Sequence, residues 1–189
     1  DLVEDILRIY GYNNVEIPTQ VPSTPSYAQK PDKTHLYNMV ADMLTARGYT
    51  EIMSNSLTKA AYYENLECYK AENCVKILNP LSTDLNVMRQ TLLFGGLESA
   101  AHNINRKSGD LMMYEFGNVY HFNPEVQSTK EAPLAPYSEY SRLGLWLTGA
   151  IRTGNWCRPE EAATIYDLKA IVANVIARLG ISDRFHFTG

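Results

Sequence analysis

A single arginine stands between a loop and a helix in residues 79–93, whose sequence is NPLSTDLNVMRQTLL. The segment opens with Asn79-Pro80, a turn dipeptide, and Ser, Thr and Asp follow it. Arg89 then precedes residues whose apolar spacing predicts the start of an amphipathic helix. A guanidinium fixed in this way can hold an anionic substrate, as catalytic arginines do, or it can pair with a carboxylate of the fold itself. The residues of this run leave both chemistries open.

Three carboxylates share one face of the first predicted helix. Asp1, Glu4 and Asp5 stand at positions i, i+3 and i+4, which are neighbours on a helix surface. Acidic residues in a first helical turn stabilise its positive end by about 0.3–1 kcal/mol. A hard cation is the alternative, although such an ion needs several oxygen ligands. The spacing alone favours helix stabilisation.

The other polar candidates form no catalytic set. The four histidines lie in unrelated segments, so neither metal-ligand spacing nor a triad can be built from them. Glu115 lies in a strand of large apolar residues, and we expect it at the surface, the alternative being a buried ion pair. We expect Trp146 in the core and Trp156, in a Gly-Asn-Trp loop, at a contact with a partner.

Composition limits the classes of function. The 189 residues are 45% apolar and 20% charged, which is enough for one hydrophobic core. A net charge of −4 excludes bulk attraction to nucleic acid. No apolar run approaches membrane-spanning length and no signal-peptide pattern is present, so we expect no membrane partner. Cys68, Cys74 and Cys157 form no CxxC pair; we expect them to be small buried residues of a cytoplasmic protein.

Hydrophobic periodicity divides the chain into three parts. Residues 1–12 form a predicted helix, closed by Gly11, which we assign to the end of a preceding domain. Residues 13–31 contain four prolines and read as an extended linker. Residues 32–189 form the main domain, which we expect to be truncated at its C-terminal end. The whole chain would then be a piece of a longer polypeptide.

Inside the main domain the predicted elements are those of an α+β fold on an antiparallel sheet. Residues 111–122 and 142–149 alternate and predict a hairpin, with a bulge at Gly117. The remaining elements are helices at residues 32–47, 60–66, 91–106 and 168–179, and strands at residues 49–57 and 75–78.

Several segments together resemble the beta subunit of bacterial phenylalanyl-tRNA synthetase. The sequence DLVEDILRIYGY at residues 1–12 resembles the last helix of that family's B5 domain. The strings MRQTLL, NINR and YEFGNVY, which begin at Met88, Asn103 and Tyr114, resemble its synthetase-core-like module. Their order and spacing make the match specific, and with residues 48–57 and 146–180 it spans essentially the whole chain.

The resemblance implies a class II aminoacyl-tRNA synthetase fold and a subunit that partners a catalytic alpha subunit in an alpha2beta2 heterotetramer. That enzyme charges tRNA(Phe) with phenylalanine, and its ATP is bound on the alpha subunit. Residues 36–57 resemble motif 1, which builds subunit interfaces. The family's B5 domain binds Mg2+ with acidic residues, three of which match Asp1, Glu4 and Asp5, and a fourth acid would precede them.

The resemblance also bears on Arg89. Catalytic class II enzymes use a second arginine on the motif 2 strand, and His121 stands at that position in this sequence. A neutral imidazole cannot replace a permanent, bidentate cation. We therefore interpret Arg89 as structural, paired with an acid in the fold or across a subunit boundary, and the module as catalytically inactive.

Two other functions are compatible with such a fold. A stand-alone class II-like ligase or acyltransferase would need a glycine-rich phosphate loop and a lysine in its pocket, and neither arrangement is found in the sequence. A regulatory synthetase paralogue would lack the domain that residues 1–12 resemble. The prediction is an architectural module that docks the alpha subunit and helps to place tRNA.

Overall fold

The computed structural model describes residues 2–20, 22–24 and 32–187. Two compact units make up the chain, one ending at Asp32 and the other beginning at Lys33. Part of the expected linker, residues 21 and 25–31, lies outside the described residues. The assignment of residues 1–12 to a preceding domain stays a prediction.

The first unit contains one amphipathic helix, α1 (Leu2–Tyr10), followed by a 3-10 turn, η1 (Tyr12–Asn14). Gly11 ends α1 with a φ of +91°, a conformation that favours glycine, and its N–H donates to the carbonyl of Leu7 at 2.8 Å. No described residue of α1 is buried, so the first unit has no core of its own.

A three-stranded sheet organises the second unit, in the order β1 (Thr50–Glu51), β4 (Leu111–Phe122) and β5 (Tyr137–Thr148). The predicted β4–β5 hairpin is confirmed, with continuous antiparallel register. The expected bulge at Gly117 is wrong because Gly117 pairs in register with Arg142. β1 runs parallel to β4, so the sheet is mixed and not wholly antiparallel; the long crossover between them makes the parallel pairing possible.

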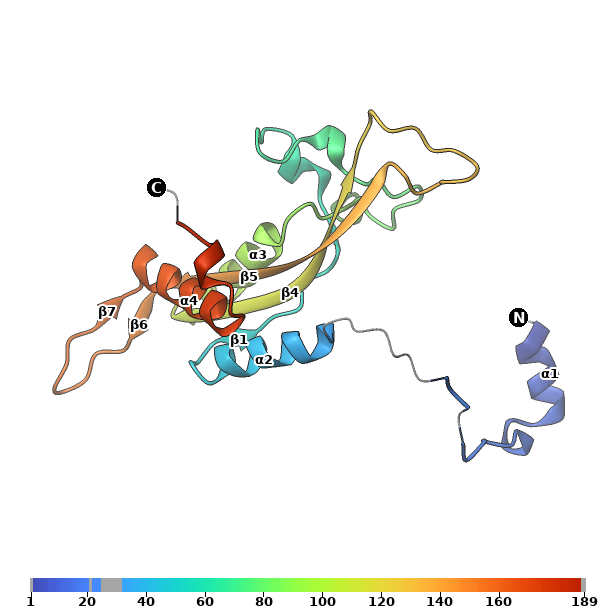
Figure 1. Cartoon of the computed structure of the whole chain (residues 1–189), viewed down its shortest axis with the longest axis horizontal. Coiled ribbons are helices and arrows are strands. Elements are labelled where there is room, and N and C mark those ends of the chain that lie inside the picture. Colours follow the sequence, from blue (N-terminus) through green and yellow to red (C-terminus); the bar gives the residue numbers. More distant parts are fainter. Residues whose placement is uncertain (1, 21, 25–31, 188–189) are drawn as a thin grey trace. The chain divides into compact units, whose positions relative to one another are not determined.

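The two faces of the sheet have separate cores. On the back face, α2 (Lys33–Thr45) and α4 (Ile165–Arg178) cover β4 and β5. On the front face lies α3 (Leu93–Ile104), and Figure 1 shows α2 and α3 on opposite sides of the strands. The buried back-face residues are Val40, Leu44, Tyr49, Tyr114, Ile171 and Val175, and those of the front are Leu92, Ala100, Met113, Val119 and Trp146.

The segment between β1 and α3 differs from the prediction. The single strand expected at residues 49–57 is divided into β1 and β2 (Leu57–Thr58), because the chain leaves β4 after Ile52. β2 pairs with β3 (Val87–Met88), and residues 75–78 make only one isolated bridge to β3. Three 3-10 turns complete this segment: η2 (Ala60–Tyr63), η3 (Ala71–Asn73) and η4 (Thr83–Leu85).

A second, small hairpin follows β5. It consists of β6 (Ala150–Arg152) and β7 (Glu161–Ala162), and it projects away from the sheet and α4 (Figure 1). The last described element is the 3-10 turn η5 (Ser182–Arg184). Over the described ranges, no helix combines the length and apolar character needed to cross a membrane.

The cysteine prediction is only partly right. Cys74 is buried in a small cluster with Tyr63 and Val87, whereas Cys68 and Cys157 are exposed. Both exposed cysteines lie in surface loops, so their small apolar character does not bury them.

Candidate functional site

Arg89 completes the edge of β4 where β1 leaves it. Ile52 donates the last β1 hydrogen bond, to the carbonyl of Tyr114 at 2.8 Å. Beyond that point the side-chain Nε of Arg89 donates to the carbonyl of Asn118 at 2.9 Å, and the Arg89 carbonyl accepts from the N–H of Tyr120 at 2.9 Å. One residue thus satisfies backbone groups that a longer strand would otherwise pair.

The guanidinium of Arg89 is also held by a buried carboxylate. Its Nη1 donates to Oε1 of Glu115 at 2.7 Å, and the two side chains are 7% and 2% exposed. Ser54 bonds to both partners: its N–H donates to Oε1 at 3.3 Å, its hydroxyl donates to Oε2, and its carbonyl accepts from Nη1 at 3.3 Å. No buried side-chain nitrogen or oxygen of the described residues lacks a hydrogen-bond partner. The pair is therefore buried and extensively hydrogen-bonded, as a stable ion pair inside a protein must be.

These contacts decide two predictions. The expected pairing of Arg89 with an acid of the fold is confirmed. The expectation that Glu115 lies at the surface is wrong. Alternation does turn its side chain away from Tyr114 and the back core, but residues 53–92 cover the front face at this point.

Gly117 makes room for this pair. A Cβ at this position would lie 2.3 Å from Nη2 of Arg89 and 2.7 Å from Cδ2 of Leu92. The residue that suggested a bulge is instead required by the close approach of a guanidinium to the strand.

A front-face cleft of about 480 Å3 lies between α3's first turn and the hairpin strands. His121 lines it, and burial together with the nearby Arg142 guanidinium lowers the pKa of its imidazole below 6.5. The ring is therefore neutral at pH 7. Arg142 is exposed and lies over the ring of Tyr140 at 5.2 Å. Gln90, also in the lining, is turned inward and donates to the carbonyl of Lys70 and to Sγ of Cys74, each at 2.9 Å.

The chemistry available in this front-face cleft is limited by that geometry. Arg89 is committed to Glu115, and His121 carries no charge at neutral pH. Among the residues that line the cleft, Arg142 is the one fixed positive charge. A triphosphate is normally held by several converging cations.

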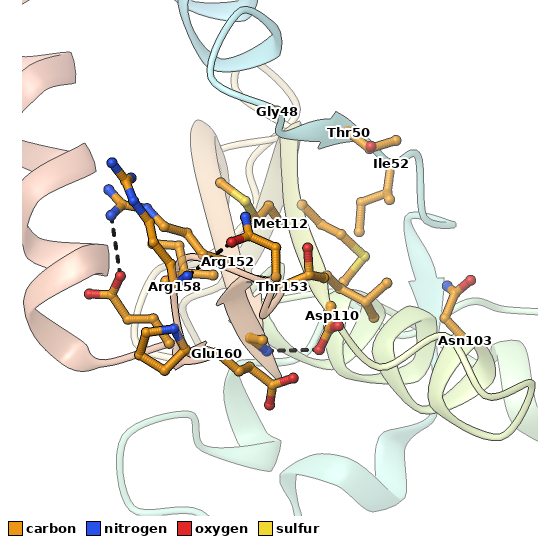
Figure 2. Close-up of a pocket in the computed structure, with 17 residues that line it drawn as sticks. Gly48, Thr50, Ile52, Asn103, Asp110, Met112, Arg152, Thr153, Arg158 and Glu160 are labelled. Atoms are coloured by element: carbon orange, nitrogen blue, oxygen red, sulfur yellow. Dashed lines mark hydrogen bonds and ion pairs between the residues drawn. The ribbon is translucent and has the colours of Figure 1, made fainter.

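A larger cleft of about 860 Å3 opens between β1, the start of β4 and the β6–β7 hairpin (Figure 2). Asp110 anchors the hairpin by accepting from the Ala150 N–H at 2.7 Å, and Arg152 pairs with Glu161 at 3.4 Å. The charged side chains that line the cleft are two arginines and three acids, so the cleft has no strong net charge. Glu160 and Arg158 are the other charged residues on the hairpin side.

The structure does not test the three acids predicted for magnesium, Asp1, Glu4 and Asp5, and they stay a prediction. Asp1 lies outside the described residues. Glu4 and Asp5 are in the first turn of α1, and Oε1 of Glu4 is paired with Nη2 of Arg8 at 2.7 Å. The described part of the chain contains no group of three or more histidine, cysteine, aspartate or glutamate side chains placed to hold a metal ion.

Sequence inspection missed two residues of this region. Ser54 bridges the ion pair, although no local pattern distinguishes it from other polar strand residues. Tyr62 donates its hydroxyl to Glu98 on α3, and this bond is the largest cause of a Tyr62 pKa raised to about 12. Both contacts join segments more than thirty residues apart, which is why neither is visible in the sequence.

Solved structures show the class of the fold. A pyrrolysyl-tRNA synthetase from Desulfitobacterium hafniense matches with a TM-score of 0.53 at 15% identity, covering 82% of this chain and 49% of that chain. A Bacillus halodurans protein described as an ATP phosphoribosyltransferase regulatory subunit/histidyl-tRNA synthetase matches at 0.52 and 17% identity, covering 83% and 39%. These similarities establish a class II tRNA synthetase-like α+β fold.

Sequence comparison identifies the family. Residues 17–189 match the family described as the phenylalanyl tRNA synthetase beta chain CLM domain. A phenylalanine–tRNA ligase beta subunit from Bacteroides fragilis is 55% identical over 182 residues, covering 96% of this chain and 22% of that protein. The chain belongs to the phenylalanyl-tRNA synthetase beta chain family, and it spans about a fifth of the length of the curated relatives it matches. Membership in this family does not favour the stand-alone ligase or the regulatory paralogue.

Proposed function

We propose that this chain is a non-catalytic module of the beta subunit of phenylalanine–tRNA ligase, the cytoplasmic enzyme that charges tRNA(Phe) with phenylalanine using ATP. The module docks the catalytic alpha subunit of an alpha2beta2 heterotetramer and helps to place tRNA. ATP and phenylalanine bind on the alpha subunit. The observation that carries the proposal, beside family membership, is the burial of Arg89 in an ion pair with Glu115.

Electrostatics supports a non-catalytic role for the front face. Releasing Arg89 to bind a phosphate would leave Glu115 as an unpaired buried charge, which typically costs about 3–5 kcal/mol. His121 does not compensate, because its lowered pKa keeps the imidazole neutral at pH 7. The front face therefore serves packing and assembly better than transition-state stabilisation.

The interface with the alpha subunit is assigned to residues 36–57, which resemble motif 1. This segment includes most of α2, Gly48, β1 and the first residue of β2. Within this segment α2 buries Val40 and Leu44 against the sheet, while Asn38, Asp42 and Thr45 stay exposed. A helix with one face in the core and another exposed can pack against a partner's helix without refolding.

Magnesium is kept as a prediction for Asp1, Glu4 and Asp5 and is given no step in this function. The two described carboxylates do not by themselves fit the ion, since Glu4 is paired with Arg8 and Mg2+ prefers octahedral oxygen coordination. In the longer relatives, further oxygen ligands would have to come from outside the described residues.

One experiment tests the proposed function. The chain is mixed with the purified alpha subunit of the Bacteroides fragilis enzyme, and the mass of the product is measured by light scattering after gel filtration. ATP is titrated into the chain alone by calorimetry. We expect a stable complex of defined stoichiometry and no ATP binding. Absence of a complex, or tight ATP binding by the chain alone, would refute the proposal.

A further inference from the structure

Residues 57–88, which we name the strap, have a small core of their own. The strap runs from β2 to β3 and includes the turns η2, η3 and η4. In Figure 1 it is the cyan-to-green lobe beyond α3, toward the end of the β4–β5 hairpin far from β6 and β7. The side chains buried in this core are Tyr63, Cys74 and Val87, and of the partly buried residues packed on them only Phe94 lies outside the strap.

The bonds of the strap are mainly internal. The β2–β3 pairing lies within it, and so do its two ion pairs, Lys59 with Asp84 at 3.6 Å and Lys70 with Glu72 at 3.5 Å. η3 passes close to β4. Even so, among the residues that the structure describes, no hydrogen bond, ion pair or ring contact joins the strap directly to β4 or β5. The strap is therefore weakly tied to the sheet that it covers.

The two ends of the strap are fixed to the sheet at one place. Ser54 precedes the strap and Arg89 follows it, and both bond to the buried Glu115 carboxylate. The two ends are also joined to each other, because the Arg89 N–H donates to the Ser56 carbonyl at 2.9 Å and Nη1 donates to the Ser54 carbonyl at 3.3 Å. A segment whose ends are held together can unfold locally and leave the elements before and after it in place.

A few contacts with Gln90 and α3 keep the strap closed. The ring of Phe94 stacks on Tyr62 at 4.7 Å between centroids and meets Tyr63 edge-on at 5.4 Å. The Tyr62 hydroxyl donates to Glu98, and the Gln90 N–H donates to Oη of Tyr63 at 3.1 Å. Loss of the two aromatic contacts would remove most of the apolar support that the strap receives from outside.

The core of the strap is too small to remain folded once these contacts are lost. It consists of three buried side chains and two strands of two residues each, and a two-stranded pair is marginal in water. Opening and local unfolding of the strap are then the same event. That event would expose Cys74 and would also remove Tyr69, which lines the front-face cleft together with His121.

We propose that the strap is a conformational gate of the front-face cleft, which opens as one cooperative unit while the sheet, α2 and α4 stay folded. The hinge is the pair of fixed ends at Ser54 and Arg89, whose bonds to Glu115 persist in the open state. The structure shows the closed state. The inference concerns contacts inside this chain and does not depend on the proposed function.

The first test uses the buried thiol of Cys74 as a reporter of opening. The wild-type chain is treated with iodoacetamide without denaturant and in low concentrations of urea, and alkylation of each cysteine is followed by mass spectrometry. Cys74 is 4% exposed and burial raises the pKa of its thiol, so the closed state is unreactive, whereas the exposed Cys157 gives the rate of an open thiol.

A local opening exposes less surface than global unfolding does, and its rate should depend less on urea. We therefore expect the alkylation rate of Cys74 to rise with urea much less steeply than the rate of global unfolding, which circular dichroism measures. A Cys74 rate that equals the global unfolding rate at every urea concentration would overturn the gate.

Variants separate the strap from the rest of the fold. We expect Phe94→Ala to raise the alkylation rate of Cys74 about tenfold, because it removes both aromatic contacts. Tyr62→Phe keeps the ring and removes the bond to Glu98, so an increase of about threefold is expected. The control is Ile171→Val, which weakens the back core and should leave the Cys74 rate within about twofold of wild type.

Two outcomes of the variant series would refute the proposal. Equal acceleration by Ile171→Val and Phe94→Ala would show that Cys74 is exposed only when the whole unit unfolds. An unchanged rate in both Phe94→Ala and Tyr62→Phe would show that these contacts do not hold the strap closed. The Tyr62→Phe comparison remains decisive if Phe94→Ala does not fold.

The second test follows the backbone by hydrogen exchange and mass spectrometry. We expect peptides from residues 57–88 to exchange together, and faster than peptides from β4, β5, α2 and α4. Peptides that contain Tyr69 should exchange with the rest of the strap, since this wall of the cleft would leave with it. Protection of the strap equal to that of β4 and β5 would refute the inference and leave the proposed function untouched.

Discussion

The two faces of the β4–β5 sheet are stabilised by different physical means. The back face buries aliphatic and aromatic residues such as Leu44, Tyr114 and Ile171 under α2 and α4. The front face buries an arginine and a glutamate beside glycines and Trp146. Apolar packing is non-directional, whereas a buried ion pair is stable only if every donor and acceptor is met. The stability of the back face therefore depends on how well apolar side chains fill its volume, and the stability of the front face depends on hydrogen-bond geometry.

The two faces should differ in how well they tolerate amino-acid substitutions. A back-face leucine can be replaced by another apolar residue of similar volume at modest cost. Arg89, Glu115 and Ser54 hold each other and the edge of β4, so a change in one leaves the others unsatisfied. Such a locked front face fixes the positions of the two hairpin strands.

The largest effect is expected from breaking the ion pair. Glu115→Ala leaves the Arg89 guanidinium buried without its counter-charge, and we expect the free energy of unfolding to fall by about 3–5 kcal/mol. Urea unfolding followed by circular dichroism measures the change. The double variant Arg89→Met, Glu115→Leu removes both charges and should lose less than the single variant. A loss under about 1 kcal/mol for Glu115→Ala would show that the Arg89–Glu115 pair contributes little to the stability of the front face.

The next test adds one methyl group to the front face. A Cβ on Gly96 of α3 would lie 1.9 Å from Cε2 of Trp146, so the indole or the helix must move. We expect Gly96→Ala to destabilise the chain by about 1–3 kcal/mol, in spite of alanine's better helix propensity. Gly109→Ala is the matched control, because nothing lies within 4 Å of its added Cβ. Thermal unfolding of both variants distinguishes a packing effect from a general cost of replacing glycine. Equal melting temperatures for the two variants would contradict the close contact between Gly96 and Trp146.

The sequence predicted the back face better than the front face. Local periodicity identified α2, α4 and both hairpin strands, because apolar residues recur there at the spacing of the element. The division of residues 49–57 into β1 and β2 was not visible, because it depends on where Arg89 meets β4. A local pattern contains no information about a partner 26 residues away, which is the separation of Arg89 and Glu115.

The same limit applies to the site residues. Arg89 could be assigned a structural role only because family resemblance placed His121 where a second cation would be needed. Glu115 was expected at the surface, since an isolated glutamate usually is. Trp156 was recognised as a contact candidate from its loop composition, and the structure confirms its exposure but leaves its partner to experiment.

A smaller effect on the front face is expected from pH. Burial and then Arg142 lower the pKa of His121 below 6.5 in the folded state, whereas the unfolded chain keeps the ordinary value. The unfolded state then binds more protons at acidic pH, so this group's contribution to stability is present above pH 6.5 and is lost as the pH falls through the folded-state pKa. The wild type should therefore lose more stability than His121→Gln between pH 7 and pH 5. Identical pH profiles would contradict the assignment, and Arg142→Gln should raise the pKa of His121, as measured by NMR titration.

The smallest expected effect is on the pKa of the Tyr62 hydroxyl, with little change in the stability of the fold. The Tyr62 hydroxyl donates to Glu98 in the middle of α3, and this bond is the largest cause of a phenol pKa raised to about 12. The shift favours the protonated phenol because ionisation would both break the bond and place a second negative charge beside the carboxylate. Glu98→Gln keeps the size of the side chain and removes the charge, so we expect the pKa of Tyr62 to fall toward 10. NMR of 13C-labelled tyrosine between pH 8 and pH 10.5 should show Tyr62 beginning to ionise in the variant but not in the wild type. Stability at neutral pH should change little, since the stacking of Tyr62 on Phe94 at 4.7 Å is preserved. If Tyr62 ionises at its ordinary pKa in the wild type, the hydrogen bond to Glu98 is absent in solution. Hydrogen-bond geometry would then stabilise the front face at Arg89 and Glu115 but not around α3.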